Sequence, residues 1–170
     1  MFTRKRSVLV ALCILLSAPL FVACCYCCRP GEQPGPQPGD GCCVTCPQAA
    51  QWKAQIDAGK YAEVVQATTK VIQAGKDAPE YAQALLYRGV AEFKLGDLKS
   101  ARDDLTRGQD VSSRMTKDEQ TLLFRTQMVV LAKLGDKKGA EQAFQKAIEI
   151  APEDQKDAIR KEYENALKPQ

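Results

Sequence analysis

The sequence predicts an all-α protein, a solenoid-like stack of about three helical hairpins closed by a final capping helix. The first observation is a repeat, because Lys-Leu-Gly-Asp occurs at residues 94–97 and again at residues 133–136. In both copies an alanine lies five residues after the glycine, and a large apolar residue lies nine residues after it. The second observation is composition: 45% of the residues are hydrophobic and only 6% are aromatic, which is typical of closely packed helices. Self-similarity at this spacing indicates a repeat architecture.

The helices can be placed from their turns and caps. Gly59-Lys60 is a fainter copy of the Gly-Asp turns and separates the first two helices. Asp77, with Pro79 and Glu80 following, predicts an N-cap with proline in the first turn of the third helix. Thr116 and Glu119 predict a capping box for the fifth helix. The expected helices are residues 48–58, 61–74, 78–95, 98–110, 117–134, 137–150 and 153–167.

Helical periodicity predicts which faces are buried. In the sixth helix, Ala140, Ala143, Phe144, Ala147 and Ile148 form an i, i+3, i+4, i+7, i+8 stripe. The last helix is mostly polar, as expected of an element that covers the end of a stack. The other residues predicted to face inward are Ala84, Leu85, Tyr87, Arg88, Gly89 and Phe93 in the third helix, Leu98, Ala101, Leu105 and Gly108 in the fourth, and Ala158, Ile159, Tyr163, Ala166 and Leu167 in the last.

Residues 47–152 resemble the tetratricopeptide repeat. The second helix of that repeat carries alanine, an aromatic residue four later, a small residue three further on and then a proline. Ala140, Phe144, Ala147 and Pro152 match this order. The fourth helix matches more loosely and the first pair is degenerate. The resemblance implies a helical solenoid, in which residues 153–170 would be the capping helix.

The resemblance also implies a concave groove, lined by the first helix of each hairpin, that holds a peptide or a partner helix. Its mixture of apolar and basic side chains suits an extended peptide that carries an acidic group. The alternative is that these cations are ordinary solvated charges. By offset from the turn glycines, the groove would present Lys53, Leu86, Val90, Lys94, Arg125, Val129 and Lys133, together with Ile56 and Asp57.

Residues 1–23 are predicted to be a targeting segment. Arg4-Lys5-Arg6 precede an apolar run at residues 8–16, and Phe21-Val22-Ala23-Cys24 then resembles the lipobox of bacterial lipoproteins. The resemblance implies cleavage after Ala23 and lipid on Cys24. Cys25 stands where aspartate would signal inner-membrane retention, so the periplasmic face of the outer membrane is favoured. The alternatives are an uncleaved transmembrane anchor, or S-acylation of a eukaryotic membrane protein at several cysteines.

Residues 24–46 are predicted to be a disordered tether. Proline and glycine dominate residues 29–41, and such a segment builds no core. Six cysteines flank it, and they favour disulfides or further acylation in an oxidising compartment. The alternatives are a zinc or iron–sulfur site using Cys43-Val44-Thr45-Cys46, or redox chemistry. The candidate disulfide residues are Cys25, Cys27, Cys28, Cys42, Cys43 and Cys46.

Charge and composition argue against several classes of function. Without the three cations of the leader, the chain has 21 Lys and Arg residues and 21 Asp and Glu residues, so its formal net charge is zero. A neutral chain argues against a nucleic-acid partner, because binding to phosphates needs a basic surface. The chain has no histidine, the commonest general base and metal ligand. We therefore expect no enzyme activity, cofactor or metal, and a membrane-anchored module that binds or scaffolds proteins. The alternatives are a pilotin-like assembly factor for a secretion or pilus complex, a cysteine-based metal or redox protein, and a tether without a specific ligand.

Overall fold

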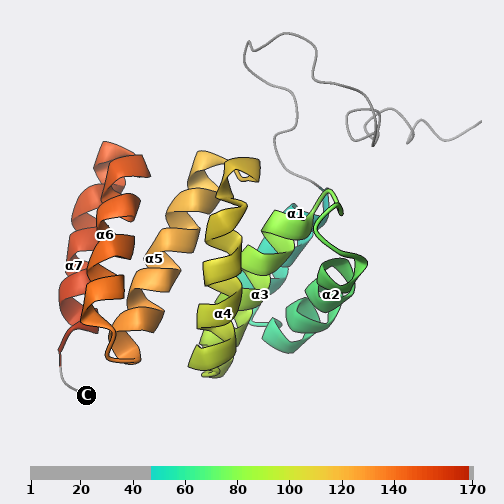
Figure 1. Ribbon diagram of the computed structural model, residues 1–170, viewed down its shortest axis with the longest axis horizontal. Helices are drawn as coiled ribbons and strands as arrows, with labels where there is room; N and C mark the ends of the chain where they lie inside the picture. Colours follow the sequence, from blue (N-terminus) through green and yellow to red (C-terminus); the bar gives the residue numbers. More distant parts are fainter. Residues whose placement is uncertain (1–46, 169–170) are drawn as a thin grey trace, which may run out of the picture. The chain divides into compact units, whose positions relative to one another are not determined.

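The computed structural model describes residues 47–168, which form successive α-helices (Figure 1). Between these residues there is no β-strand, and the all-α prediction is confirmed. The predicted leader, the lipidated Cys24 and the cysteine-rich tether lie outside the described residues. The elements are α1 (Pro47–Asp57), α2 (Tyr61–Ala74), α3 (Tyr81–Leu95), α4 (Leu98–Asp110), the short 3-10 helix η2 (Ser112–Arg114), α5 (Lys117–Lys133), α6 (Lys137–Ile150) and α7 (Glu153–Ala166).

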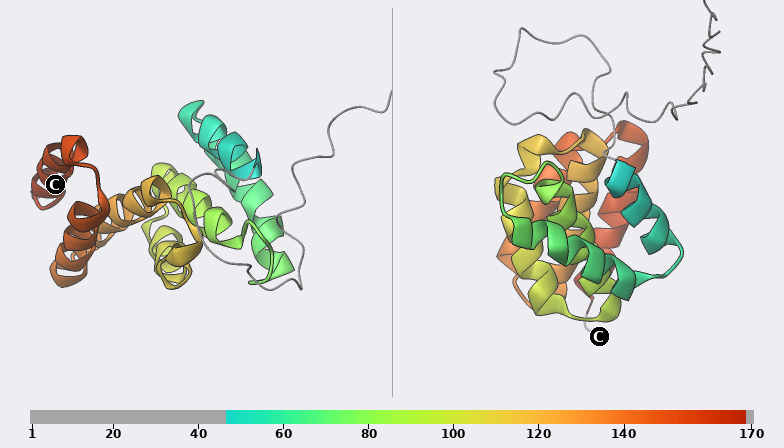
Figure 2. Two further views of the ribbon diagram at one scale, coloured as in Figure 1. Left: turned by 90° about the horizontal axis from the view of Figure 1, so that it is seen from above. Right: turned by 90° about the vertical axis from the view of Figure 1, so that its right-hand side faces the viewer.

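Neighbouring helices pack in chain order as hairpins. α1 packs on α2, α3 on α4 and α5 on α6, while α2 contacts α3 and α4 contacts α5. The odd-numbered helices also contact one another, so that α1 meets α3, α3 meets α5 and α5 meets α7. In Figure 2, α6 and α7 lie at one end of this series and α1 and α2 at the other. No helix between residues 47 and 168 is both long and apolar enough to cross a bilayer.

The two Lys-Leu-Gly-Asp turns have the same geometry. Gly96 and Gly135 adopt φ of +87° and +83°, a left-handed conformation that favours glycine because it has no Cβ. The aspartates that follow both have φ −81° and ψ 79°, and each caps the next helix. Asp97 accepts a hydrogen bond from Ser100 N at 3.1 Å, and Asp136 accepts one from Gly139 N at 2.9 Å. The sequence repeat is therefore a structural repeat.

The predicted start of the third helix is wrong. α3 begins at Tyr81, after a turn, and Asp77 does not cap it. The reason is a contact from elsewhere in the chain: Arg114, at the end of η2, donates to the carbonyl oxygens of Lys76, Ala78 and Pro79 at 2.7, 2.7 and 3.1 Å. These hydrogen bonds pair the carbonyl groups of the segment in its turn conformation, so the segment does not need a helical conformation to pair them. The short helix η2 was not predicted.

The capping box of the fifth helix is confirmed. Thr116 Oγ1 accepts from Glu119 N at 3.3 Å, and Glu119 Oε2 accepts from Thr116 N at 2.9 Å. Two orphan amides at the start of α5 are thereby satisfied reciprocally. The Glu119 side chain also lies within 3.4 Å of Gln83 Nε2, so the cap ties α5 to α3.

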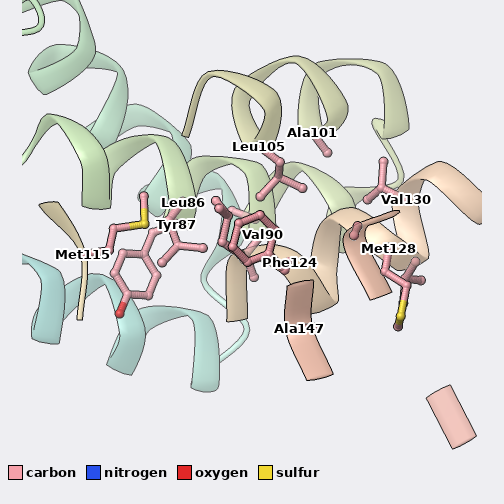
Figure 3. Packing of buried hydrophobic residues seen from close by; sticks show 14 of the residues in the cluster. Leu86, Tyr87, Val90, Ala101, Leu105, Met115, Phe124, Met128, Val130 and Ala147 are labelled. Atoms are coloured by element: carbon pink, nitrogen blue, oxygen red, sulfur yellow. The ribbon is translucent and has the colours of Figure 1, made fainter. Parts of the chain in front are cut away.

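A continuous apolar core runs along the hairpins, and close helix contacts depend on small residues (Figure 3). Ala101 and Leu105 of α4 are fully buried against α3. A Cβ on Gly89 would lie only 2.8 Å from Leu105 Cγ, so a larger residue there would force the two helices apart. Gly108 has a similar relation to Leu123, at 2.9 Å. The inward positions predicted for α4 are therefore correct, with Leu98 only half-buried.

A cluster of charged side chains is buried between α2, α3 and α4. Arg88 donates through two nitrogens to Asp104, and its third contact is Thr69 Oγ1 at 3.1 Å. Asp104 also accepts from Arg107 at 3.4 Å, and Glu92 lies 3.7 Å from Arg88. The second carboxylate oxygen of Glu92 is buried and accepts no hydrogen bond within the described residues. Burial, and then the charge of Asp104, raise the pKa of Glu92 to about 7.

The pKa of Glu92 predicts that stability falls with rising pH. A carboxyl group whose pKa is higher in the folded than in the unfolded chain binds its proton more tightly when folded. Its favourable contribution is present below pH 4.5 and is lost as the pH rises through about 7. The Glu92→Gln substitution should raise the free energy of unfolding by roughly 2 kcal/mol near pH 8 and by much less near pH 5. Urea unfolding at both pH values measures this difference.

The chain has no histidine, so no imidazole titrates in the same pH interval as Glu92. Glu164→Gln is the matched control, since Glu164 is an exposed carboxylate on α7. It should show no such pH dependence. Equal effects of Glu92→Gln at the two pH values would contradict the prediction.

Candidate partner-binding site

Three of the residues predicted to line the groove belong to the core: Leu86, Val90 and Val129. Leu86 is fully buried and Val90 is 5% exposed. Both lie on α3, which contacts α1 on one side and α5 on the other, so these side chains fill the space between successive hairpins (Figure 3). They cannot contact a partner, and their assignment to the groove was wrong.

Lys53 and Lys94 are exposed, and each contacts a residue of its own helix. Lys53 is 3.5 Å from Asp57, one turn along α1, in an ion pair whose side chains are both mostly exposed. Such pairs contribute little to stability. Lys94 extends over the ring of Phe93, with 5.6 Å between its Nζ and the ring centroid. These two cations are solvated charges in this structure.

Val129 and Lys133 lie together at a hollow of about 520 Å³ between α5 and α7. Val129 is nearly buried and forms part of the apolar lining with Ala158 and Ala166. Lys133, Lys161, Glu162 and Asn165 supply the polar lining. Of the residues predicted to line the groove, Val129 and Lys133 are the two that line this hollow.

Three contacts fix α7 beside α5 and α6. Ile159 is fully buried in the core. Tyr163 stacks on Phe144 with ring centroids 4.5 Å apart and planes 10° apart. The Tyr163 hydroxyl also donates to the Glu141 carboxylate, a bond that raises the pKa of Tyr163 to about 12 and lowers the pKa of Glu141. The far wall of the hollow is thus held by packing and by a charged hydrogen bond.

Arg125 pairs with Glu162, one of the residues that line the hollow. Its Nε and Nη2 donate to one oxygen of Glu162 at 3.0 and 2.9 Å, which joins α5 to α7. Both side chains are about a third exposed, so the pair contributes modestly to stability. The pair matters more for the charge of the hollow, because Arg125 offsets the negative charge of Glu162, the carboxylate that lines it. Arg125 therefore acts in positioning α7 and is not an open cation for a ligand.

The remaining rim is basic. A smaller hollow of about 220 Å³ adjoins the first and shares Lys133 and Ala166 with it. Lys137, Lys168 and the 39%-exposed Leu167 line this second part. Within residues 47–168, no carboxylate lies within 4 Å of Lys133, Lys137, Lys161 or Lys168. Four cations therefore border an apolar surface that includes an exposed leucine.

The α7 wall was missed by sequence reasoning, which treated this helix as a cap only. A signal was present, because residues 158, 161, 162, 165 and 166 follow the i, i+3, i+4, i+7, i+8 spacing of one helix face. The face is mostly polar, so it forms no apolar stripe of the kind that predicts a buried helix face. Chemically, the combined α5–α7 surface can receive an apolar side chain and pair with neighbouring carboxylates.

No model of a known protein family matches this chain, and a search of curated proteins also finds no match.

Proposed function

We propose that this chain is a lipid-anchored protein-interaction module of the tetratricopeptide type, which recruits or scaffolds a partner at the bacterial cell envelope. The observation that carries the proposal is the α5–α7 hollow, with its apolar lining and its unpaired lysines. The partner segment would be extended or helical, with one large apolar side chain between acidic residues. Protein partners bury apolar anchors in such hollows and use rim charges for orientation.

Three features support the tetratricopeptide type. The hairpins follow one another with left-handed glycine turns at Gly96 and Gly135. The small residues Ala101 and Ala140 are fully buried, as close packing of the two helices in a hairpin requires. A terminal helix with a largely polar surface covers the last hairpin through Ile159 and Tyr163.

The anchor is proposed from the N-terminal sequence. Residues 21–24 read Phe-Val-Ala-Cys after a basic and apolar leader, and lipid on Cys24 would hold the chain on the bilayer. The proline- and glycine-rich residues 29–41 would then separate the helical unit from the membrane surface by up to ~40 Å. A location on the periplasmic face of the outer membrane follows from Cys25 at the sorting position.

Binding at the hollow can be tested with peptides of designed charge. A peptide with leucine between glutamates should bind the purified chain, and the same peptide with lysines in place of glutamates should not. The Lys133→Glu and Lys161→Glu double variant should weaken binding at least ~10-fold, since each reversal replaces attraction by repulsion. Isothermal titration calorimetry measures the affinities.

The repeat supplies a matched control. Lys94 lies two residues before Gly96, as Lys133 lies two residues before Gly135, but Lys94 lines neither the α5–α7 hollow nor the smaller hollow beside it. Lys94→Glu should leave the affinity for the glutamate peptide unchanged. A loss of affinity equal to that of the double variant would mean that only the overall charge matters, and would refute the site.

The anchor is tested by the intact mass of the mature protein. We expect a chain that begins at Cys24 with a diacylglyceryl group and an N-acyl chain, and a Cys24→Ser variant that retains its leader. Recovery of an unmodified, uncleaved chain from membranes would favour the transmembrane alternative instead. The same measurement counts disulfides among the remaining cysteines, because each one lowers the mass by two hydrogens.

A further inference from the structure

One end of the helical unit is basic. The α3–α4 turn, the α5–α6 turn and the end of α7 lie together at the lower edge in Figure 1. We call this surface the turn end and define it as residues 94–100, 133–139 and 166–168. It contains six lysines and two aspartates, and the aspartates are the caps of α4 and α6. The lysines are all exposed, and none of them pairs with a carboxylate within residues 47–168: Lys94, Lys99, Lys133, Lys137, Lys138 and Lys168.

The opposite end has the opposite charge. The links that join successive hairpins and α7 there, residues 75–80, 110–118 and 149–154, contain three cations and seven acidic residues. One of these cations, Arg114, is bonded to carbonyl groups of the chain itself. The unit is therefore electrically polar along its helices, although the chain without its leader has no net charge.

The turn end also carries both of the large apolar side chains that are exposed between residues 47 and 168. They are Leu95, which is 56% exposed, and Leu167, which is 39% exposed. The repeat does not require this exposure, because Leu134 has the place of Leu95 in the second Lys-Leu-Gly-Asp turn and packs against the core. Single exposed leucines are ordinary, but here both coincide with the basic end.

A flat anionic surface with an apolar layer beneath it fits this pattern. In Figure 1 the α5–α6 turn lies between the α3–α4 turn and the end of α7, so the two leucines are on separate elements. Lys94, Leu95 and Lys99 line neither hollow beside α7, so a peptide seated there leaves them unexplained. A bilayer presents headgroups over a whole plane, and lysines reach these headgroups while leucines enter the acyl boundary.

We propose that the turn end binds the surface of a bilayer that contains anionic lipid. The inference rests on the membrane anchor of the proposed function and does not involve the peptide. In this orientation the acidic links point away from the bilayer, where their repulsion from anionic headgroups is weakest.

The test inserts the full-length chain from detergent into preformed phosphatidylcholine vesicles, with and without ~30% phosphatidylglycerol. A membrane-impermeant acetylating reagent then modifies exposed lysines, and mass spectrometry gives the rate at each one. Phosphatidylglycerol should slow acetylation at the turn end at least ~5-fold and leave Lys76 and Lys117, at the acidic end, unchanged. Flotation with the neutral vesicles reports the anchor alone, so failure of the anchor and failure of the turn end are distinguishable.

Reversing two charges tests the role of the lysines. Lys99 and Lys138 line neither hollow beside α7, and each lies in the first turn of a helix, where an acidic side chain is stabilising. The Lys99→Glu and Lys138→Glu double variant should therefore fold, and should lose at least ~5-fold of the protection at the other turn-end lysines. Lys76→Glu with Lys117→Glu is the matched control and should keep the protection.

Leu95→Ala tests the apolar contact and should lower the protection at least ~3-fold, because less apolar surface enters the bilayer. Equal acetylation in the two kinds of vesicle, equal slowing at both ends of the unit, or full protection in the Lys99→Glu and Lys138→Glu variant would each overturn the proposal. Polyglutamate, added to the chain in detergent, is the probe for an acidic protein surface. Selective protection of the turn end by polyglutamate, together with full protection of Leu95→Ala on vesicles, would assign this end to a protein and would also overturn the proposal.

Discussion

The Leu105→Ala substitution should lower the free energy of unfolding by about 3 kcal/mol. Leu105 is fully buried in α4 among the core side chains that Figure 3 shows, and it lies against Gly89 of α3. Removing its isopropyl group loses apolar burial and leaves a cavity, and both effects destabilise the hairpin. Urea unfolding followed by circular dichroism measures the change.

Two comparisons make this result specific. Leu95→Ala removes the same group from a side chain that is 56% exposed, and should change stability by less than ~0.5 kcal/mol. Gly89→Ala should destabilise the wild type through the 2.8 Å clash with Leu105 Cγ, but should be neutral or stabilising in the Leu105→Ala background. Equal effects of Gly89→Ala in both backgrounds would show that the two residues do not compete for one space.

The Asp104→Ala substitution should cost about 3 kcal/mol, because it breaks a buried ion pair on one side only. Arg88 would keep its charge between α2, α3 and α4, with Thr69 and the more distant Glu92 as its remaining partners. The pKa of Glu92 should fall at the same time, since the charge of Asp104 contributes to raising it. Unfolding free energies near pH 8 and pH 5 report both effects.

Asp103→Ala is the control for this change. Asp103 neighbours Asp104 in sequence, but its side chain is 64% exposed and pairs with Arg102 at the surface. Its removal should cost less than ~0.5 kcal/mol. A loss of stability as large as that of Asp104→Ala would mean that net charge on α4, and not the buried pair, determines the outcome.

The hairpins could be predicted from the sequence because their signals are local. Turn glycines, the Asp97 and Asp136 caps and the Thr116 capping box are each set by residues within one turn of the chain. The start of α3 could not be predicted in the same way. It depends on Arg114, which lies more than thirty residues from the carbonyl groups that it binds.

The candidate site was only partly predictable for a related reason. Helical periodicity separates the inside of a hairpin from its outside, but it does not say which outer residues meet the next hairpin. Leu86 and Val90 were placed in the groove because they share offsets with exposed positions, yet contacts of α3 with α1 and α5 bury them. The hollow forms instead between α5 and α7.

The common geometry of the Asp97 and Asp136 turns has a consequence for the length of the protein. The α3–α4 and α5–α6 hairpins turn with the same backbone dihedral angles at the aspartate, so the 39 residues from one turn glycine to the next, Gly96 to Gly135, form a unit that joins to itself without a new kind of turn. Gene duplication could add such a unit, and α7 would still close the stack on the final hairpin. The distance between the first hairpin and the surface formed by α5 and α7 is therefore adjustable in discrete steps, independently of the side chains that line that surface.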